Sequence, residues 1–137
     1  MSGIRELSVL LSSMEPSLRA GEFVYCTVPG ADPRDFLHLD PLGLFQEAEG
    51  LTLILAAETA GAAGLAASAP LRCITLNVHS SLEAVGLTAA VSAALTEEGI
   101  SANVVAAYYH DHVFVPTADA DRAVEALRAL SARSSEA

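Results

Sequence analysis

The sequence predicts an α+β fold built from two small units in tandem, each an antiparallel sheet with helices on one face. Three observations predict it. Apolar residues alternate with polar ones in several short runs, as in half-buried strands. Between those runs apolar residues recur at helical spacing. The order strand, helix, strand, strand, helix also occurs twice, and because the two halves share little residue similarity, the duplication is inferred from element order alone.

Composition limits the classes of function. The 137 residues are 52% hydrophobic, yet no apolar run is long enough for a membrane span. The formal net charge of −10, with seven dispersed Lys and Arg residues, disfavours a nucleic-acid partner. No secretory signal pattern opens the chain, so we expect a soluble, cytoplasmic protein. Cys26 and Cys73 lie in strand-like runs, and we expect two buried, reduced thiols.

Residues 1–18 predict a short amphipathic helix that packs on a sheet. Ile4, Leu7, either Leu10 or Leu11, and Met14 fall at helical spacing, and Pro16 marks the end of the helix.

Residues 19–68 predict the first unit. The run from Glu22 to Val28 alternates and is rich in aromatic and β-branched residues, which favours a strand. Asp32 followed by Pro33 is typical of a helix start, so a turn or two is expected to about His38. The remaining elements are two strands joined by a hairpin and one short helix: residues 43–49, 51–56 and 58–63.

Residues 69–131 predict the second unit, and here the signals agree best. The run from Arg72 to His79 alternates as a strand does. A helix with one apolar stripe is expected from Gly86 to the glycine cap at Gly99. A hairpin then joins strands at residues 100–109 and 112–116. Thr117 opens a last helix, after which residues 132–137 form a flexible tail.

These residues resemble the ACT domain family. The resemblance rests on the strand ending at His79, on Val85-Gly86-Leu87, on the helix end at 94–100, and on the hairpin into Val113-Phe114-Val115. Many ACT domains open this helix with Pro-Gly, and here Val85 stands in place of the proline. The whole chain is similar to small free-standing proteins with two ACT-like units. The resemblance implies a ferredoxin-like βαββα fold, a regulatory role and a homodimer.

The candidate site is the loop before the predicted helix at Gly86. A helix N-terminus offers unpaired N–H groups, and a glycine lets another molecule approach, which together suit a carboxylate such as that of an amino acid. In ACT domains this loop and a strand facing it across an interface bind the effector, which implies these ligand-binding residues: His79, Ser80, Ser81, Leu82, Glu83, Ala84, Val85, Gly86, Leu87, Asn103, Val104 and Val105. The alternative is that Ser80 or Ser81 only caps the helix and Gly86 only permits close packing.

Catalytic chemistry has weaker support. His110, Asp111 and His112 could ligate a metal together with His79, but residues that flank a tight turn need not converge, so we expect no metal and no cofactor. Ser80 follows His79, and adjacent strand residues point to opposite faces, so we expect no enzyme.

The hypothesis is therefore a regulatory protein that binds a small carboxylate, an amino acid, at an interface beside residues 79–86. Tyr108 and Tyr109, on a sheet with one open face, favour a homodimer. The alternatives are a protein-interaction module without a ligand and, less favoured, a small metal-dependent enzyme.

Overall fold

The computed structural model describes residues 6–136, and the chain forms two compact units. The smaller unit is Ala20–Leu71, and the larger unit comprises the described residues up to Arg19 and from Arg72 onward. The smaller unit is therefore an insertion in the sequence of the larger one, between its first two strands. Among residues 6–136 no helix is long and apolar enough to cross a membrane.

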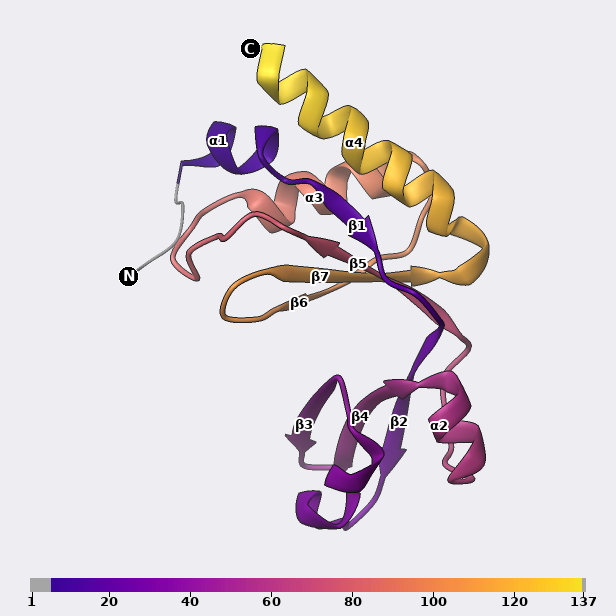
Figure 1. Ribbon diagram of the computed structural model, residues 1–137. Coiled ribbons are helices and arrows are strands. Elements are labelled where there is room, and N and C mark those ends of the chain that lie inside the picture. The colour runs from indigo at the N-terminus through magenta and orange to yellow at the C-terminus, as the bar shows by residue number, and fades with distance from the viewer. Residues whose placement is uncertain (1–5, 137) are drawn as a thin grey trace. The chain divides into compact units, whose positions relative to one another are not determined.

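The larger unit is one sheet covered by helices (Figure 1). Its elements are, in chain order, α1 (Leu7–Ser12), β1 (Pro16–Leu18), β5 (Leu71–Leu76), α3 (Leu87–Glu97), β6 (Asn103–Ala106), β7 (Asp111–Pro116), the 3-10 turn η2 (Thr117–Asp119) and α4 (Ala120–Glu136). The strand order is β1-β5-β7-β6. β1 is antiparallel to β5, with Pro16 opposite Leu76, and β6 is antiparallel to β7, with Ala106 opposite Asp111.

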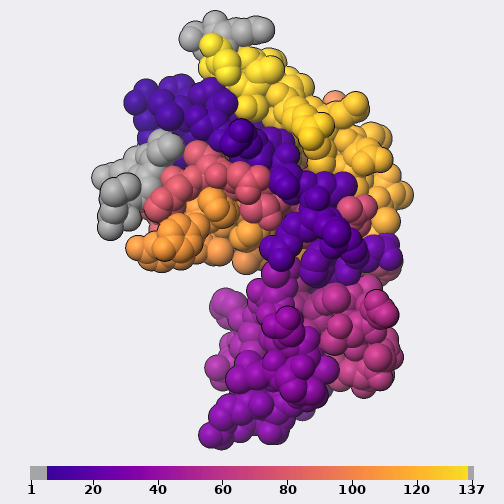
Figure 2. Space-filling view, in the orientation of Figure 1, coloured from indigo at the N-terminus to yellow at the C-terminus, as the bar shows by residue number. Residues whose placement is uncertain are grey.

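The core of the larger unit lies between one face of this sheet and α1, α3 and α4. Alternation in β5 and β7 directs Ile74, Leu76, Val113 and Val115 to that face, and all four are buried against the helices. Figure 2 shows the atoms of α1 beside those of α4. The strand, helix, strand, strand, helix order is the ferredoxin-like arrangement, and β1, which precedes it in sequence, supplies the fourth strand.

The smaller unit repeats this plan. Its elements are β2 (Phe23–Val28), the 3-10 helix η1 (Pro33–Leu39), β3 (Gly43–Glu47), β4 (Gly50–Ala56) and α2 (Ala57–Ala62). β4 lies between β3 and β2, and Ala67 bridges to Cys26 on the other edge of β2. The core consists of buried residues from β2, β4 and α2: Val24, Cys26, Leu51, Leu53, Leu55 and Ala60.

The predicted fold class is confirmed. The tandem ferredoxin-like α+β architecture is present. The helix expected after Gly86 runs from Leu87 to Glu97, and Gly99 follows it with a φ of 69°. Cys26 and Cys73 are free and buried, as expected.

The N-terminal segment differs from the prediction. Pro16 does not only mark the end of a helix; it begins strand β1, which was not predicted from the sequence. A proline is tolerated as the first residue of an edge strand, where its missing N–H is not needed by a neighbour. The predicted helix contribution of Ile4 lies outside the described residues.

Strand β5 ends at Leu76 and not at His79. Its partner strand β1 begins at Pro16, opposite Leu76, and the preceding Glu15 has a φ of 44°. Asn77 holds the chain just before β1 with two hydrogen bonds: its backbone N–H donates to Met14 O at 2.9 Å, and its side-chain amide donates to Glu15 O at 2.8 Å. Strand β5 therefore ends before the loop that carries the candidate site, although Ser80 within that loop still takes part in a β-bridge.

Two further boundaries are corrected. β6 is shorter than the predicted 100–109, because Ile100 N–H still bonds Leu95 O of the helix cap and Ala107 N–H bonds His110 O in the hairpin turn. Helix α4 continues through residues 132–136, which we expected as a flexible tail. The hydroxyl of Ser131 donates to Ser12 O at 3.2 Å, which fastens this last part of α4 to the end of α1.

Candidate functional site

A cavity of about 170 Å³ lies in the larger unit, where the loop after β5 leads into α3. Three segments line it: the loop, the first turn of α3 and the β6–β7 hairpin. The lining residues are Ser80, Ser81, Leu82, Ala84, Gly86, Leu87, Thr88, Ala106 and Asp111. Its volume is below the ~300–1,000 Å³ usual for sites of drug-sized ligands, so it has room for a small metabolite only.

The predicted site residues divide into two groups. Ser80, Ser81, Leu82, Ala84, Gly86 and Leu87 line this cavity. The others do not line it: His79, Glu83, Val85, Asn103, Val104 and Val105. The ring of His79 lies 5.1 Å from that of Tyr109, and Val85 is 82% exposed.

Thr88, Ala106 and Asp111 line the cavity but were missing from the predicted set. For Asp111 a usable signal was present in the sequence. It alternates in register with Val113 and Val115, so it lies on the same, helix-covered face of β7, whereas we expected it only to flank a tight turn.

The start of α3 has no side-chain cap. Gly86 occupies the N-cap position with a φ of 99°, a conformation that favours glycine, and no side chain bonds the helix start there. The hydroxyl of Ser81 instead accepts from Glu83 N–H at 3.1 Å, within the loop. The alternative in which Ser80 or Ser81 caps α3 is therefore not what the structure shows. Close packing at Gly86 is present, however, because an added Cβ would lie 3.1 Å from Leu7 Cδ2.

Asp111 is a buried acid at this cavity, with 8% of its surface exposed. Burial raises the pKa of its carboxyl, and the charge of neighbouring His110 lowers that pKa by less. Within residues 6–136 no group forms a hydrogen bond or ion pair with its carboxylate. Ser80 and Ser81, which are 7% and 9% exposed, are the other buried polar side chains of the lining.

The histidines do not assemble a metal centre. The Nδ1 of His110 donates to Val78 O, and the Nδ1 of His112 lies 2.9 Å from Thr75 Oγ1. In the described part of the chain, no three His, Cys, Asp or Glu side chains lie close enough together to hold a metal ion.

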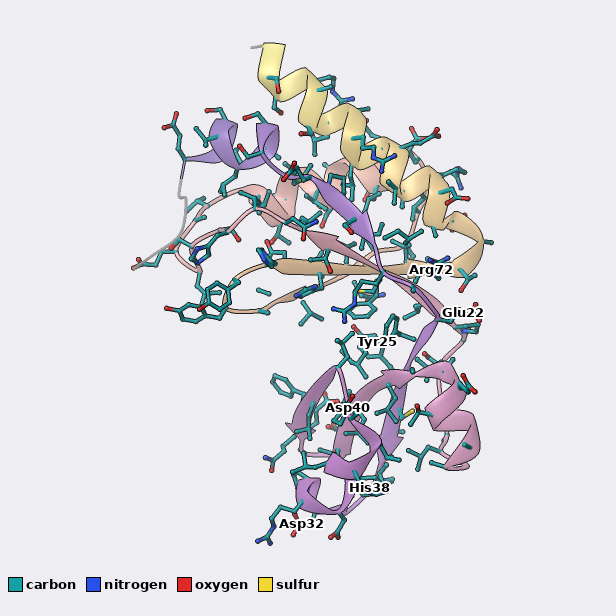
Figure 3. All side chains as sticks on the ribbon, viewed as in Figure 1. Glu22, Tyr25, Asp32, His38, Asp40 and Arg72 are labelled. Carbon is teal, nitrogen blue, oxygen red and sulfur yellow. The ribbon has the colours of Figure 1, made fainter. Side chains whose placement is uncertain are left out.

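The smaller unit has a cavity of about 140 Å³ at the equivalent place, between the loop after β2 and the β3–β4 hairpin. Asp32, the N-cap residue of η1, does not line this cavity, and its own side chain caps the helix start. The carboxylate of Asp32, a residue labelled in Figure 3, accepts from Arg34 N–H at 2.9 Å and pairs with the Arg34 guanidinium at 2.7 Å. A carboxylate of the chain itself therefore occupies the position that α3 leaves open.

Comparisons with known proteins agree with this architecture. Two family models, both described as ACT domain, match residues 2–72 and 68–129. A Vibrio cholerae protein of unknown function, described as a possible transport protein, is 55% identical over 91% of this chain and 95% of its own, with a TM-score of 0.83. Curated protein sequences give no match.

More distant structures share the fold. An Agrobacterium tumefaciens protein is 16% identical with a TM-score of 0.69, over 85% of this chain and 87% of its own. The ligand-free regulatory subunit of aspartate kinase from Thermus thermophilus is 10% identical with a TM-score of 0.65, over 86% of this chain and 97% of its own.

Proposed function

Because this chain belongs to the ACT domain family, we propose that it is a cytoplasmic regulatory protein that binds a small carboxylate, an amino acid, in the cavity beside α3. ACT domains are regulatory and not catalytic modules, and a fold shared with a regulatory subunit of aspartate kinase supports a regulatory role. The observation that carries the proposal is the uncapped N-terminus of α3, an eleven-residue helix, at the wall of a small cavity.

The physical basis is the electrostatics of a helix end. The first N–H groups of a helix have no partner within it, and the helix dipole adds a partial positive charge of about half a unit at that end. An anion placed there gains about 0.3–1 kcal/mol when exposed, and up to about 2 kcal/mol when partly buried. Hydroxyls of Ser80 and Ser81, both buried in the same cavity wall, can donate further hydrogen bonds to a carboxylate.

Exposed apolar side chains around the cavity support a homodimer as part of the proposal. Leu82 and Val85 in the loop, and Tyr108 and Tyr109 in the hairpin turn, are each at least 60% exposed. A second copy that covers them would close the cavity from outside, so ligand binding and assembly would be coupled. In that assembly His79, Glu83, Val85 and residues 103–105 contact the ligand or the partner copy.

Thr88 offers a direct test. It lies in the first turn of α3 and lines the cavity. Thr88→Glu places a competing carboxylate at the helix start, where a negative charge stabilises the helix, so the variant folds but should bind at least roughly tenfold more weakly. Thr88→Gln has the same size without the charge and should bind within a few-fold of the original protein.

The measurement is calorimetric titration of all three proteins with a panel of amino acids at millimolar concentration. The proposal fails if no amino acid binds, or if Thr88→Glu binds as tightly as Thr88→Gln. The alternative is a protein-interaction module that uses the same exposed side chains. In that case sedimentation would show dimerisation or partner binding, and adding an amino acid would not change it.

A further inference from the structure

The outer strand of the smaller unit, β3, has a free edge. Among the strands of residues 6–136 it pairs with β4 alone, so the side of β3 that faces away from β4 has no strand beside it (Figure 1). About half of the backbone N–H and C=O groups of such a strand point outward, where a further extended segment can pair with them. This edge also carries a large apolar side chain, Phe45, which is 69% exposed.

Phe45 shares one face of β3 with Glu47, because residues two positions apart point to the same side of a strand. The opposite face carries Leu44, which packs against the core of the unit. The Oε1 atom of Glu47 accepts from the hydroxyl of Thr52 at 2.5 Å, and Thr52 is the residue that pairs with Phe45 across the two strands. The ring and the carboxylate are therefore neighbours on one exposed surface.

An arginine side chain has the chemistry to bind this ring and this carboxylate together. Its planar guanidinium stacks on an aromatic ring, and its N–H groups can pair with a carboxylate through two parallel hydrogen bonds. The ammonium group of a lysine lacks both the plane and the second bond. Cross-strand neighbours lie about 4.5–5.5 Å apart, so an arginine on a segment paired with β3 would reach Phe45 and Glu47.

The charge of the smaller unit favours a basic partner. Of the 17 Asp and Glu residues of the chain, seven lie in Ala20–Leu71, which holds one of the seven Lys and Arg residues. That residue, Arg34, already pairs with Asp32. Nucleic acids and anionic membranes would be repelled by this charge. A second copy is disfavoured as well, because two β3 edges would bring the carboxylates of Glu47 and Glu49 of both copies together.

We propose that the free edge of β3 binds an extended, arginine-bearing segment of a partner protein. The segment adds a strand to the sheet and places an arginine against Phe45 and Glu47. In this mode of recognition the main-chain hydrogen bonds supply affinity and the alternate side chains supply specificity. The inference goes beyond the proposed function, since it concerns the smaller unit and not the cavity beside α3, and it assigns a surface for a protein partner.

The experiment measures the binding of fluorescently labelled peptides to the full chain by anisotropy. The probe is a capped peptide in which arginine and valine alternate. Three comparison peptides replace every arginine with lysine, every arginine with glutamate, or every valine with proline, which removes backbone donors and keeps the charge. We expect the lysine peptide to bind about two- to fivefold more weakly than the probe, and the other two not to bind measurably. The bound probe should also slow amide hydrogen exchange in residues 43–47.

Variants locate the site. Phe45→Ser and Glu47→Gln should each lower the affinity for the probe about two- to fivefold. Both positions are exposed, so both variants should fold. Two matched controls should bind the probe as the original protein does. Leu37→Ser removes an apolar side chain of η1 that is 59% exposed, and Glu58→Gln removes a carboxylate from the exposed surface of α2.

Three results would overturn the inference: no binding of the probe, equal binding of the proline peptide, or equal losses in Glu47→Gln and Glu58→Gln. The last would mean that net charge alone attracts the peptide. Glu47 would then serve only to keep the edge from pairing with other chains. None of these results bears on amino-acid binding at α3, which the titrations of the Thr88 variants test separately.

Discussion

The Nδ1 atom of His110 lies 3.0 Å from the carbonyl oxygen of Val78. A carbonyl oxygen can only accept, so Nδ1 carries the proton and donates it. This bond joins the β6–β7 hairpin, which carries Asp111, to the loop that leads into α3. The two walls of the cavity are thus held together by a side chain that does not line it.

His110→Ala should therefore increase the local motion of the cavity walls while lowering the overall stability of the protein only slightly. Loss of one partly buried hydrogen bond costs about 1 kcal/mol of unfolding free energy. We expect faster amide hydrogen exchange in residues 78–86 and amino-acid affinity lowered several-fold. His38→Ala, in the smaller unit (Figure 3), is the control and should change neither. Unchanged exchange in His110→Ala would show that the loop keeps its place without this bond.

Gly86→Ala tests the strained start of α3. With a φ of 99° at this position and Leu7 Cδ2 at 3.1 Å from an added Cβ, the variant should lose about 1–3 kcal/mol of unfolding free energy. Gly61→Ala is the matched control. Gly61 lies within α2 with no atom within 4 Å of an added Cβ, so the same change there should stabilise by about 0.5–1 kcal/mol.

A second variant separates the two causes at Gly86. Leu7→Ala combined with Gly86→Ala removes the close contact but leaves the backbone strain. Urea denaturation measures the unfolding free energy. If Gly86→Ala costs none of it when added to Leu7→Ala, the backbone conformation contributes nothing and glycine is required there for packing alone.

His112 should make the protein sensitive to mild acid. Burial lowers its pKa below the ordinary 6.5, and the charges of Arg19 and His110 lower it further. The unfolded chain therefore binds a proton at higher pH than the folded one does. The resulting stability is fully present above pH 6.5 and is lost as the pH falls from 6.5 to the lowered pKa of the folded protein.

His112→Gln removes this titration and can still bond Thr75 Oγ1, which lies 2.9 Å from His112 Nδ1. Denaturation with urea between about pH 5 and pH 8 should show a smaller loss of stability on acidification for His112→Gln than for the original protein. Parallel curves for the two proteins would mean that His112 does not cause the acid sensitivity.

Asp111 should contribute with the opposite sign. Its pKa is raised above 3.8 by burial, so the folded protein holds the proton to higher pH than the unfolded chain. The stability gained from this is present below pH 3.8 and is lost as the pH rises through the folded pKa. Without ligand, Asp111→Asn should therefore be more stable than the original protein at pH 7, and the gap should narrow in acid. A less stable Asp111→Asn at pH 7 would mean that the carboxylate is paired.

The fold was predictable where its signals are local. Glycines at positions 86 and 99 bound α3, and alternation marks β2, β4 and β7 within a few residues. Strand β1 was not predictable, because three residues carry no period of their own and become a strand only by pairing with β5, about sixty positions away in sequence. The same long-range pairing makes residues 20–71 an insertion, which no local composition change signals.

The site was predictable to the same extent. The helix start and its loop are contiguous in sequence; seven of their residues line the cavity, and six of those seven were predicted. Asp111 and Ala106 reach it from a hairpin that is distant in sequence, so their place depends on strand register. Strict attention to alternation along β7 would have placed Asp111 on the covered face, since Val113 and Val115 are two and four positions away.

The difference between the two units predicts the number of ligands. α3 starts without a side-chain cap, whereas Asp32 occupies the start of η1 with its own carboxylate and holds Arg34 beside it. A ligand carboxylate at the start of η1 would have to displace the carboxylate of Asp32, whose local concentration is high because it belongs to the same chain. We therefore expect one amino acid bound per chain in calorimetry. Thr88→Glu should remove all of the binding heat, and a remainder of half would show that the cavity at residues 30–51 also binds.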